Sequence, residues 1–244
     1  MELSLRRCGS SGLLPLALMT CCALVPLGAA AWAGVVTPRS VISATESAIA
    51  KQASVHVVFV ARAGSPSKTE TIVADVGRTN GTETATEGRA SLVIRLSTTH
   101  AYVSGNASGL TTIFGMSSAE AKKVGKKWES WRAGTSQYAN LKSDVTMSSV
   151  RALLPKAKGT TVAAVVSAGS TFSVLKWKIA ATSSIPGVTN TLTISSGATT
   201  LPVKEVARVS NGAQATTTLS EWGEPLVVGI PPSATTIPSS KIIG

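Results

Sequence analysis

The sequence contains few cysteine, histidine and aromatic residues, and each of these shortages argues against a class of function. Its three cysteines all lie within the first 22 residues, so the rest of the chain forms neither a disulfide framework nor a cysteine-rich metal site. Two histidines, His56 and His100, leave little material for a histidine-based metal site or a catalytic triad. We therefore expect no catalytic residue, no metal and no cofactor, and predict that the protein is not an enzyme.

Motifs of common enzymes are missing as well. The chain contains no Gly-x-Gly-x-x-Gly, no Walker-type phosphate loop, no His-Glu-x-x-His and no Gly-x-Ser-x-Gly. His56 lies in an apolar segment, which is typical of a partly buried ring with a hydrogen-bond partner. Nothing in these patterns assigns a nucleophile or a general base.

Hydrophobic residues make up 43% of the chain and charged residues 14%, with a mean hydropathy of +0.26. This balance excludes a disordered chain, which needs low hydrophobicity and high net charge. Only residues 12–36 are both uncharged and predominantly apolar over the roughly 20 positions that a membrane-spanning helix requires. A protein with several membrane spans is therefore excluded.

Acidic residues are also scarce. The formal net charge is +11, and residues 34–244 keep 21 basic and 11 acidic residues, a net charge of +10. Such a surface attracts anionic lipid head groups, acidic glycans or nucleic acid. The basic residues are scattered and aromatic residues are few, so we expect no nucleic-acid partner and favour an anionic membrane surface.

The N-terminus has the layout of an export signal over residues 1–33. Arg6 and Arg7 precede an apolar stretch at 12–30, and Ala31-Trp32-Ala33 matches a small-x-small cleavage site. A second interpretation uses 18–21, Leu-Met-Thr-Cys, as a lipobox in which Cys21 becomes the lipidated first residue. A third leaves the segment uncleaved as an anchor. All three predict an exported protein, either lipid-anchored outside the plasma membrane or secreted.

The remaining residues predict one α+β domain over 37–232, followed by a flexible tail at 233–244. Thr37 and Pro38 begin a helix that runs to Gln52, and Ser117 with Glu120 forms a capping box for another. Further short helices are expected at 137–143 and 146–154. We predict strands at 54–62, 69–77, 82–88, 89–96, 101–105, 126–131, 171–181, 188–195, 199–209 and 214–222.

Turn signals fix how the strands connect. Asn80-Gly81 is a strong hairpin signal, and turns recur about every ten residues after position 170. Segment 82–88 is polar on both faces, which is typical of an exposed or edge strand. The pattern predicts an antiparallel sheet with short helices packed on one face.

Several segments resemble the actinobacterial lipoprotein family of LppX and LprG, within the wider LolA/LolB-like group. They are residues 101–107, 110–114 and 118–127 with the following Trp128, and the ending Leu-Ser-Glu-Trp-Gly-Glu-Pro-Leu-Val-Val at 219–228. The likeness extends over roughly 37–232. It implies a strongly curved antiparallel half-barrel with helices on its concave face, and an apolar cavity that holds acyl chains of lipids or lipoglycans. The weak lipobox at Cys21 departs from the family pattern.

Residues on the expected inner faces are the candidates for lining such a cavity, and each serves equally well as ordinary core: Val57, Phe59, Leu92, Ile94, Phe114, Trp177 and Leu192. The basic cluster of Lys122, Lys123, Lys126 and Lys127 is either a contact with lipid head groups or a solvated helix surface. The sequence predicts non-catalytic binding and transfer of acylated lipids in the cell envelope. The alternative is an envelope interaction module, such as a chaperone or sensor, without a lipid ligand.

Overall fold

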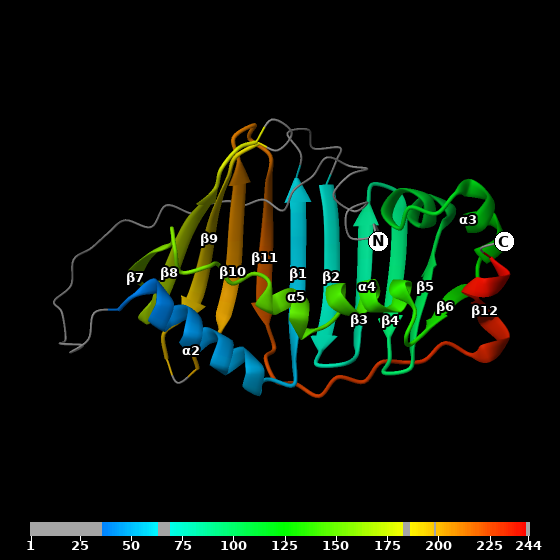
Figure 1. Ribbon diagram of the computed structural model, residues 1–244, viewed down its shortest axis with the longest axis horizontal. Helices are drawn as coiled ribbons and strands as arrows, with labels where there is room; N and C mark the ends of the chain where they lie inside the picture. The colour runs from blue at the N-terminus through cyan, green and yellow to red at the C-terminus, as the bar shows by residue number, and fades with distance from the viewer. Residues whose placement is uncertain (1–35, 63–68, 183–185, 198, 243–244) are drawn as a thin grey trace.

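The computed structural model describes residues 36–62, 69–182, 186–197 and 199–242. The expected export signal, its cleavage site and Cys21 lie outside the described residues. Within them, the chain forms a single curved sheet with a few short helices (Figure 1).

Twelve strands form this sheet in the order β12-β6-β5-β4-β3-β2-β1-β11-β10-β9-β8-β7. All neighbouring pairs are antiparallel except β12 with β6, which are parallel. The strands are β1 (Ser54–Arg62), β2 (Thr69–Gly77), β3 (Gly81–Glu87), β4 (Ala90–Leu96), β5 (His100–Gly105), β6 (Trp128–Arg132), β7 (Thr161–Ser167), β8 (Ser170–Ile179), β9 (Val188–Ser195), β10 (Pro202–Val209), β11 (Gln214–Ser220) and β12 (Thr236–Pro238).

The helices lie mainly on one face of the sheet (Figure 1). They are α2 (Pro38–Lys51), the π-helix η1 (Gly109–Ile113), α3 (Ser118–Val124), α4 (Ser136–Asp144) and α5 (Met147–Arg151), followed by the 3-10 turns η2 (Ser233–Thr235) and η3 (Ser239–Lys241). Helices α2, α4 and α5 cross in front of the strands, and α3 lies near β5 and β6 at one end. The predicted α+β class, with short helices on a curved antiparallel sheet, is confirmed.

Helix α2 begins as the sequence predicts. The Thr37 hydroxyl accepts a hydrogen bond from the Ser40 backbone at 3.1 Å, and the Ser40 hydroxyl accepts one from the Thr37 backbone at 3.1 Å. This reciprocal cap satisfies donors that the first helical turn leaves free. The apolar stripe of α2 then buries Val41, Ile42 and Ile49 against the sheet.

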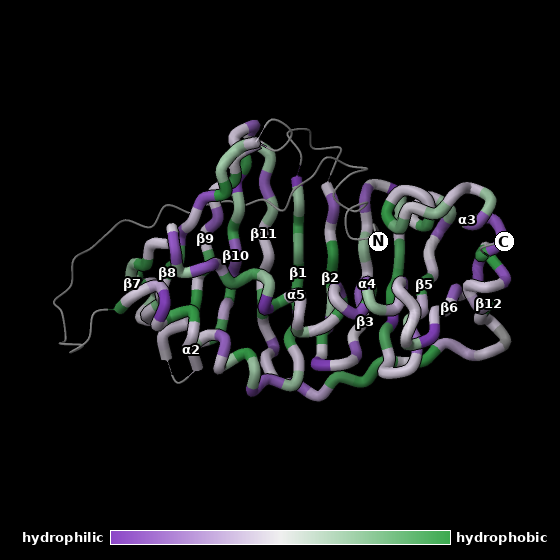
Figure 2. Tube along the Cα trace, viewed as in Figure 1, coloured by the Kyte–Doolittle hydropathy of each residue, from purple (hydrophilic) through white to green (hydrophobic). Residues whose placement is uncertain are grey.

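Strand β4 shows how the sheet divides its two faces. Ala90, Leu92, Ile94 and Leu96 are buried, whereas the residues between them are half-buried. Successive side chains of a strand point to opposite faces, so this alternation separates a helix-covered face from an outer face. Hydrophobic residues recur along the strands from one end of the sheet to the other (Figure 2). The core is therefore spread along the whole sheet.

Glycine allows η1 to lie directly on the sheet. A Cβ added at Gly109 would lie 1.9 Å from the carbonyl oxygen of Ser91 in β4. Only a residue without a side chain permits this approach. Leu110 and Ile113 of η1 consequently reach the core cluster that contains Leu92 and Ile94.

Three expectations differ from the structure. The edge-strand prediction for 82–88 is wrong, because β3 lies between β2 and β4 and buries Glu83 and Ala85. Strand β7 was not expected, because its small aliphatic residues show no alternating pattern. The segment expected to be a flexible tail contains β12, and its Ile242 is buried in the core.

Candidate functional site

An apolar groove of about 640 Å³ lies between α2 and the β7–β9 end of the sheet. Helix α2 supplies one wall through Val41 and Ala44, with Val36 and Ser40 at its start. The opposite wall comes from β7, the start of β8 and the loop after β9: Val162, Ala163, Ala164, Thr171, Ser173, Ser196, Gly197 and Thr200. Among the described residues, none that belongs to this lining is charged or aromatic.

A closely packed cluster adjoins the groove and shares Val41 and Val162 with its lining. Val41 and Ile42 of α2 contact Leu175 of β8 and Leu192 and Ile194 of β9. Leu175, Leu192 and Ile194 are fully buried. Because these aliphatic side chains fix α2 on the sheet, the groove wall is held in place by the core itself.

The seven predicted cavity residues are distributed over all four core clusters. Leu92, Ile94 and Phe114 pack beneath η1 and α4, Val57 packs near α5, and Phe59 packs among alanines and valines of β1, β10 and β11. Trp177 and Leu192 belong to the cluster that adjoins the groove. The groove lining itself contains none of the seven, so their role in holding a ligand stays a prediction.

Sequence reasoning missed the residues that line the groove. Ala44, Ala163 and Ala164 are small and exposed, and they come from segments more than a hundred positions apart. Hydrophobic periodicity marks buried faces and therefore gives no signal for such positions. Their shared feature, small side chains without charge, becomes meaningful only once β7 and α2 lie together.

The basic cluster Lys122, Lys123, Lys126 and Lys127 is exposed on α3 and the turn after it. The Lys123 ammonium donates a hydrogen bond to the Ile242 carbonyl at 2.8 Å, so part of the cluster holds the C-terminal segment. Lys122 and Lys126 border a second hollow of about 770 Å³ with Asn106, Ser108 and Thr111. This hollow, whose lining includes two lysines, lies at the end of the sheet away from the groove.

Two buried glutamates have perturbed acidity. Burial raises the pKa of Glu205 to about 7. A weak hydrogen bond of 3.5 Å from the Thr217 hydroxyl favours the charged form and opposes this rise only in part. Burial, with a smaller effect of the Glu120 charge, raises the pKa of Glu129 to about 7. Neither Glu129 oxygen has a hydrogen-bond partner among the described residues. Neither glutamate lines the groove.

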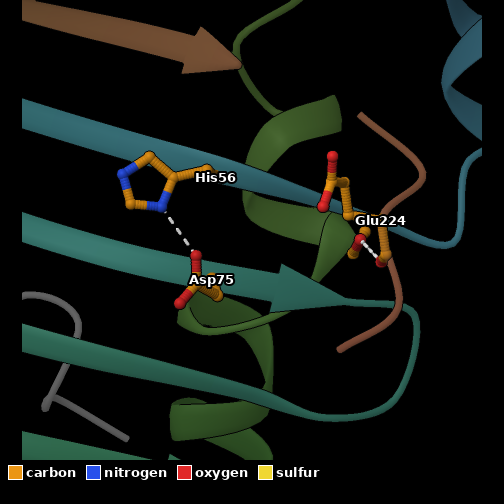
Figure 3. Close-up of polar contacts among 4 residues, drawn as sticks. His56, Asp75 and Glu224 are labelled. Carbon is orange, nitrogen blue, oxygen red and sulfur yellow. Dashed lines mark hydrogen bonds and ion pairs between the residues drawn. The ribbon is translucent and has the colours of Figure 1, made fainter. Parts of the chain in front are cut away.

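His56 and Asp75 form a pair on the outer face of the sheet. His56 Nδ1 lies 2.6 Å from Asp75 Oδ1, across the register of β1 and β2 (Figure 3). Nearby, the Ser54 hydroxyl donates to the Glu224 carbonyl. The partly buried, hydrogen-bonded ring predicted for His56 is confirmed, and it lies on the face opposite to the groove.

Among the described residues, no group of three His, Cys, Asp or Glu side chains could hold a metal ion. In the same part of the chain, no helix has the length and hydrophobicity needed to cross a membrane.

Solved structures with this arrangement of strands include LprF from Mycobacterium bovis. LprF superposes with a TM-score of 0.50 over 80% of this chain and 96% of its own, at 16% sequence identity. The fold is that of LprF. The resemblance to the LppX/LprG group is thereby confirmed at the level of the fold.

Two further structures align over most of the chain. LppX of Mycobacterium tuberculosis gives a TM-score of 0.48 at 16% identity, covering 79% of this chain and 98% of its own. A DUF1329 family protein from Desulfovibrio piger gives 0.27 at 9% identity, with coverages of 77% and 93%. No protein-family model and no curated protein matches the sequence.

Proposed function

We propose that this protein binds the acyl chain of a lipid or lipoglycan in the groove between α2 and the β7–β9 end, and carries it within the bacterial cell envelope without catalysis. The observation behind the proposal is the uncharged lining of the groove. Its volume of about 640 Å³ is within the range of small-molecule sites, roughly 300–1,000 Å³. The protein would be exported, then anchored through Cys21 or released.

The chemistry of the lining favours a flexible aliphatic ligand. Valine and alanine side chains offer apolar surface, and the polar side chains of the described lining are the uncharged hydroxyls of Ser40, Thr171, Ser173, Ser196 and Thr200. Each methylene removed from water contributes about 0.8 kcal/mol, so a long chain needs no specific polar contact to bind. A charged head group gains nothing inside this lining and would stay in solvent.

The direct test is whether the purified protein holds lipid. Native mass spectrometry of the protein is expected to show a bound mass that organic extraction identifies as an acylated lipid. The proposal is contradicted when the protein contains no lipid and gains none after incubation with phospholipid vesicles.

Filling the groove tests its location. Ala44→Trp and Ala164→Trp place indole rings in the groove from its two walls, at positions that are exposed and outside the core. Because each displaced methylene contributes about 0.8 kcal/mol, the double variant should bind a fluorescent fatty acid at least about tenfold more weakly. Ser47→Trp, on the same helix but away from the groove, is the matched control and should bind normally. Equal loss in the control would place the ligand elsewhere.

A further inference from the structure

Charge is divided very unevenly along the chain. Residues 145–204 contain Arg151, Lys156, Lys158, Lys176, Lys178 and Lys204, and no aspartate or glutamate. This run comprises β7, β8 and β9, which are neighbours at one end of the sheet. Strands β7, β8 and β9 therefore carry no acidic residue, whereas helix α2, which forms the other groove wall, carries Arg39, Glu46 and Lys51, so this end keeps a net positive charge.

Lysines flank the edge strand β7 on both sides. Lys176 and Lys178 lie on β8 next to β7, and they alternate with Leu175 and Trp177, which pack under α2. Their side chains therefore project from the outer face. Lys156 and Lys158 are exposed in the segment that crosses the helix-covered face from α5 to β7 (Figure 1).

Strand β7 itself is uncovered and apolar. Its sequence is Thr-Val-Ala-Ala-Val-Val-Ser, none of its residues is buried, and Val166 is 66% exposed. In the part of the chain that the structure describes, β8 is the strand that pairs with it. Val162, Ala163 and Ala164 of the same strand line the groove, so the uncovered edge and the groove are continuous.

From this placement we infer that the β7 edge, with Lys156, Lys158, Lys176 and Lys178 beside it, docks on an anionic phospholipid bilayer and presents the groove to it. Lysines on both faces of the edge complement the head-group charge, and the aliphatic side chains of β7 lie against the interfacial region. The backbone edge of β7 stays at head-group level, because unpaired peptide groups are not stable in the hydrocarbon core. The inference rests on the proposed function, since docking would bring the groove to its lipid source.

Hydrogen exchange followed by mass spectrometry gives a local readout in the full chain. Vesicles of phosphatidylglycerol mixed with phosphatidylcholine should slow exchange of the β7 and β8 amides, whereas pure phosphatidylcholine vesicles should not. Salt at about 0.5 M should remove the protection, because it screens charges beyond a few ångströms. Protection that is equal on both kinds of vesicle would overturn the inference.

Charge reversal identifies the lysines involved. Each lysine near an anionic surface strengthens binding about fivefold, so Lys176→Glu with Lys178→Glu should raise the lipid concentration for half-maximal protection at least about 25-fold. Lys156→Glu with Lys158→Glu should act similarly. Lys122→Glu with Lys126→Glu, in the basic cluster on α3, is the matched control and should leave protection unchanged. An equal effect in the control would assign docking to general charge and overturn the inference.

Two outcomes separate this inference from competing interpretations. Protection of β7 that rises with protein concentration in the absence of vesicles would indicate strand pairing between copies, and would overturn membrane docking. Bound lipid measured in the same samples tests the groove independently. If the protein holds lipid but vesicles do not slow hydrogen exchange in β7, membrane docking is contradicted and the proposed function is not. If vesicles slow exchange in β7 but the protein holds no lipid, the proposed function is contradicted and membrane docking is not.

Discussion

Glu129 and Glu205 are carboxyl groups in a largely aliphatic interior, at 1% and 9% exposure. Their pKa values rise to about 7 because burial disfavours the charged form. In the unfolded chain a glutamate ionises near its ordinary value of 4.5. Between these two values the folded state binds more protons than the unfolded state, so folding stability falls as the pH rises.

This linkage predicts that stability declines from about pH 4.5 to about pH 7 and levels off above that. Glu205→Gln keeps a hydrogen-bonding amide beside Thr217 without a charge, so it should remove up to about 3 kcal/mol of that decline. Denaturant unfolding at several pH values measures the effect. Glu129→Gln should act in the same direction, and combining the two should nearly flatten the profile. A variant as pH-dependent as the parent would show that Glu205 is ionised at little cost in the folded protein.

At the scale of single elements, the alternation of buried and half-buried side chains along a strand decides which residues contribute most to stability. In β4, Ile94 is fully buried in the large cluster beneath η1, whereas Val93 faces outward and is only half-buried. The two residues are neighbours of similar chemistry. Comparing substitutions at the two positions therefore measures how much burial on the helix-covered face contributes to the free energy of unfolding.

Ile94→Ala should lower the free energy of unfolding by about 2–5 kcal/mol, because it removes buried methyl groups and leaves a cavity. Val93→Ala should cost less than about 1 kcal/mol, since its side chain is partly in solvent already. Urea denaturation of both variants measures the contrast. Similar losses would mean that both faces of β4 are covered in solution.

At the scale of the whole molecule, the two ends of the sheet differ in how they are protected. At one end the parallel strand β12 pairs with β6, and Ile242 enters the core beside α3. At the other end β7 stays uncovered and exposes Val166. An open apolar edge tends to attract another surface, and the lysines around β7 oppose pairing with a second basic chain.

The C-terminal anchor gives a prediction at this scale. Ile242→Ala should destabilise the protein by about 2–4 kcal/mol, because Ile242 is 1% exposed and contributes to the core. Ile230→Ala, at a residue that is 54% exposed, is the matched control and should be nearly neutral. Thermal unfolding compares them. A neutral effect of Ile242→Ala would restore the expectation of a flexible tail from position 233.

Much of the secondary structure could be predicted from local chemistry. Thr37 with Pro38 and Ser117 with Glu120 begin their helices where expected, because capping involves only residues three positions apart. Strand β1 matches its predicted bounds, and Trp128 and Trp131 face opposite sides, as strand geometry requires. Strand β3 was misjudged because its sequence is polar on both faces, whereas its place between β2 and β4 depends on pairing with distant segments that no local pattern contains.

The sequence by itself determined the α+β class, the placement of most strands, the basic balance and the acid-free stretch between 145 and 204. Each of these depends on composition or on neighbours along the chain. Only the tertiary structure decided that seven inward-facing candidates belong to four separate clusters, and that small residues of α2 and β7 meet in a groove. The physical reason is that the hydrophobic pattern of the sequence indicates which side chains are removed from water. The order of the strands in the sheet decides which of these side chains contact one another and which surface remains exposed.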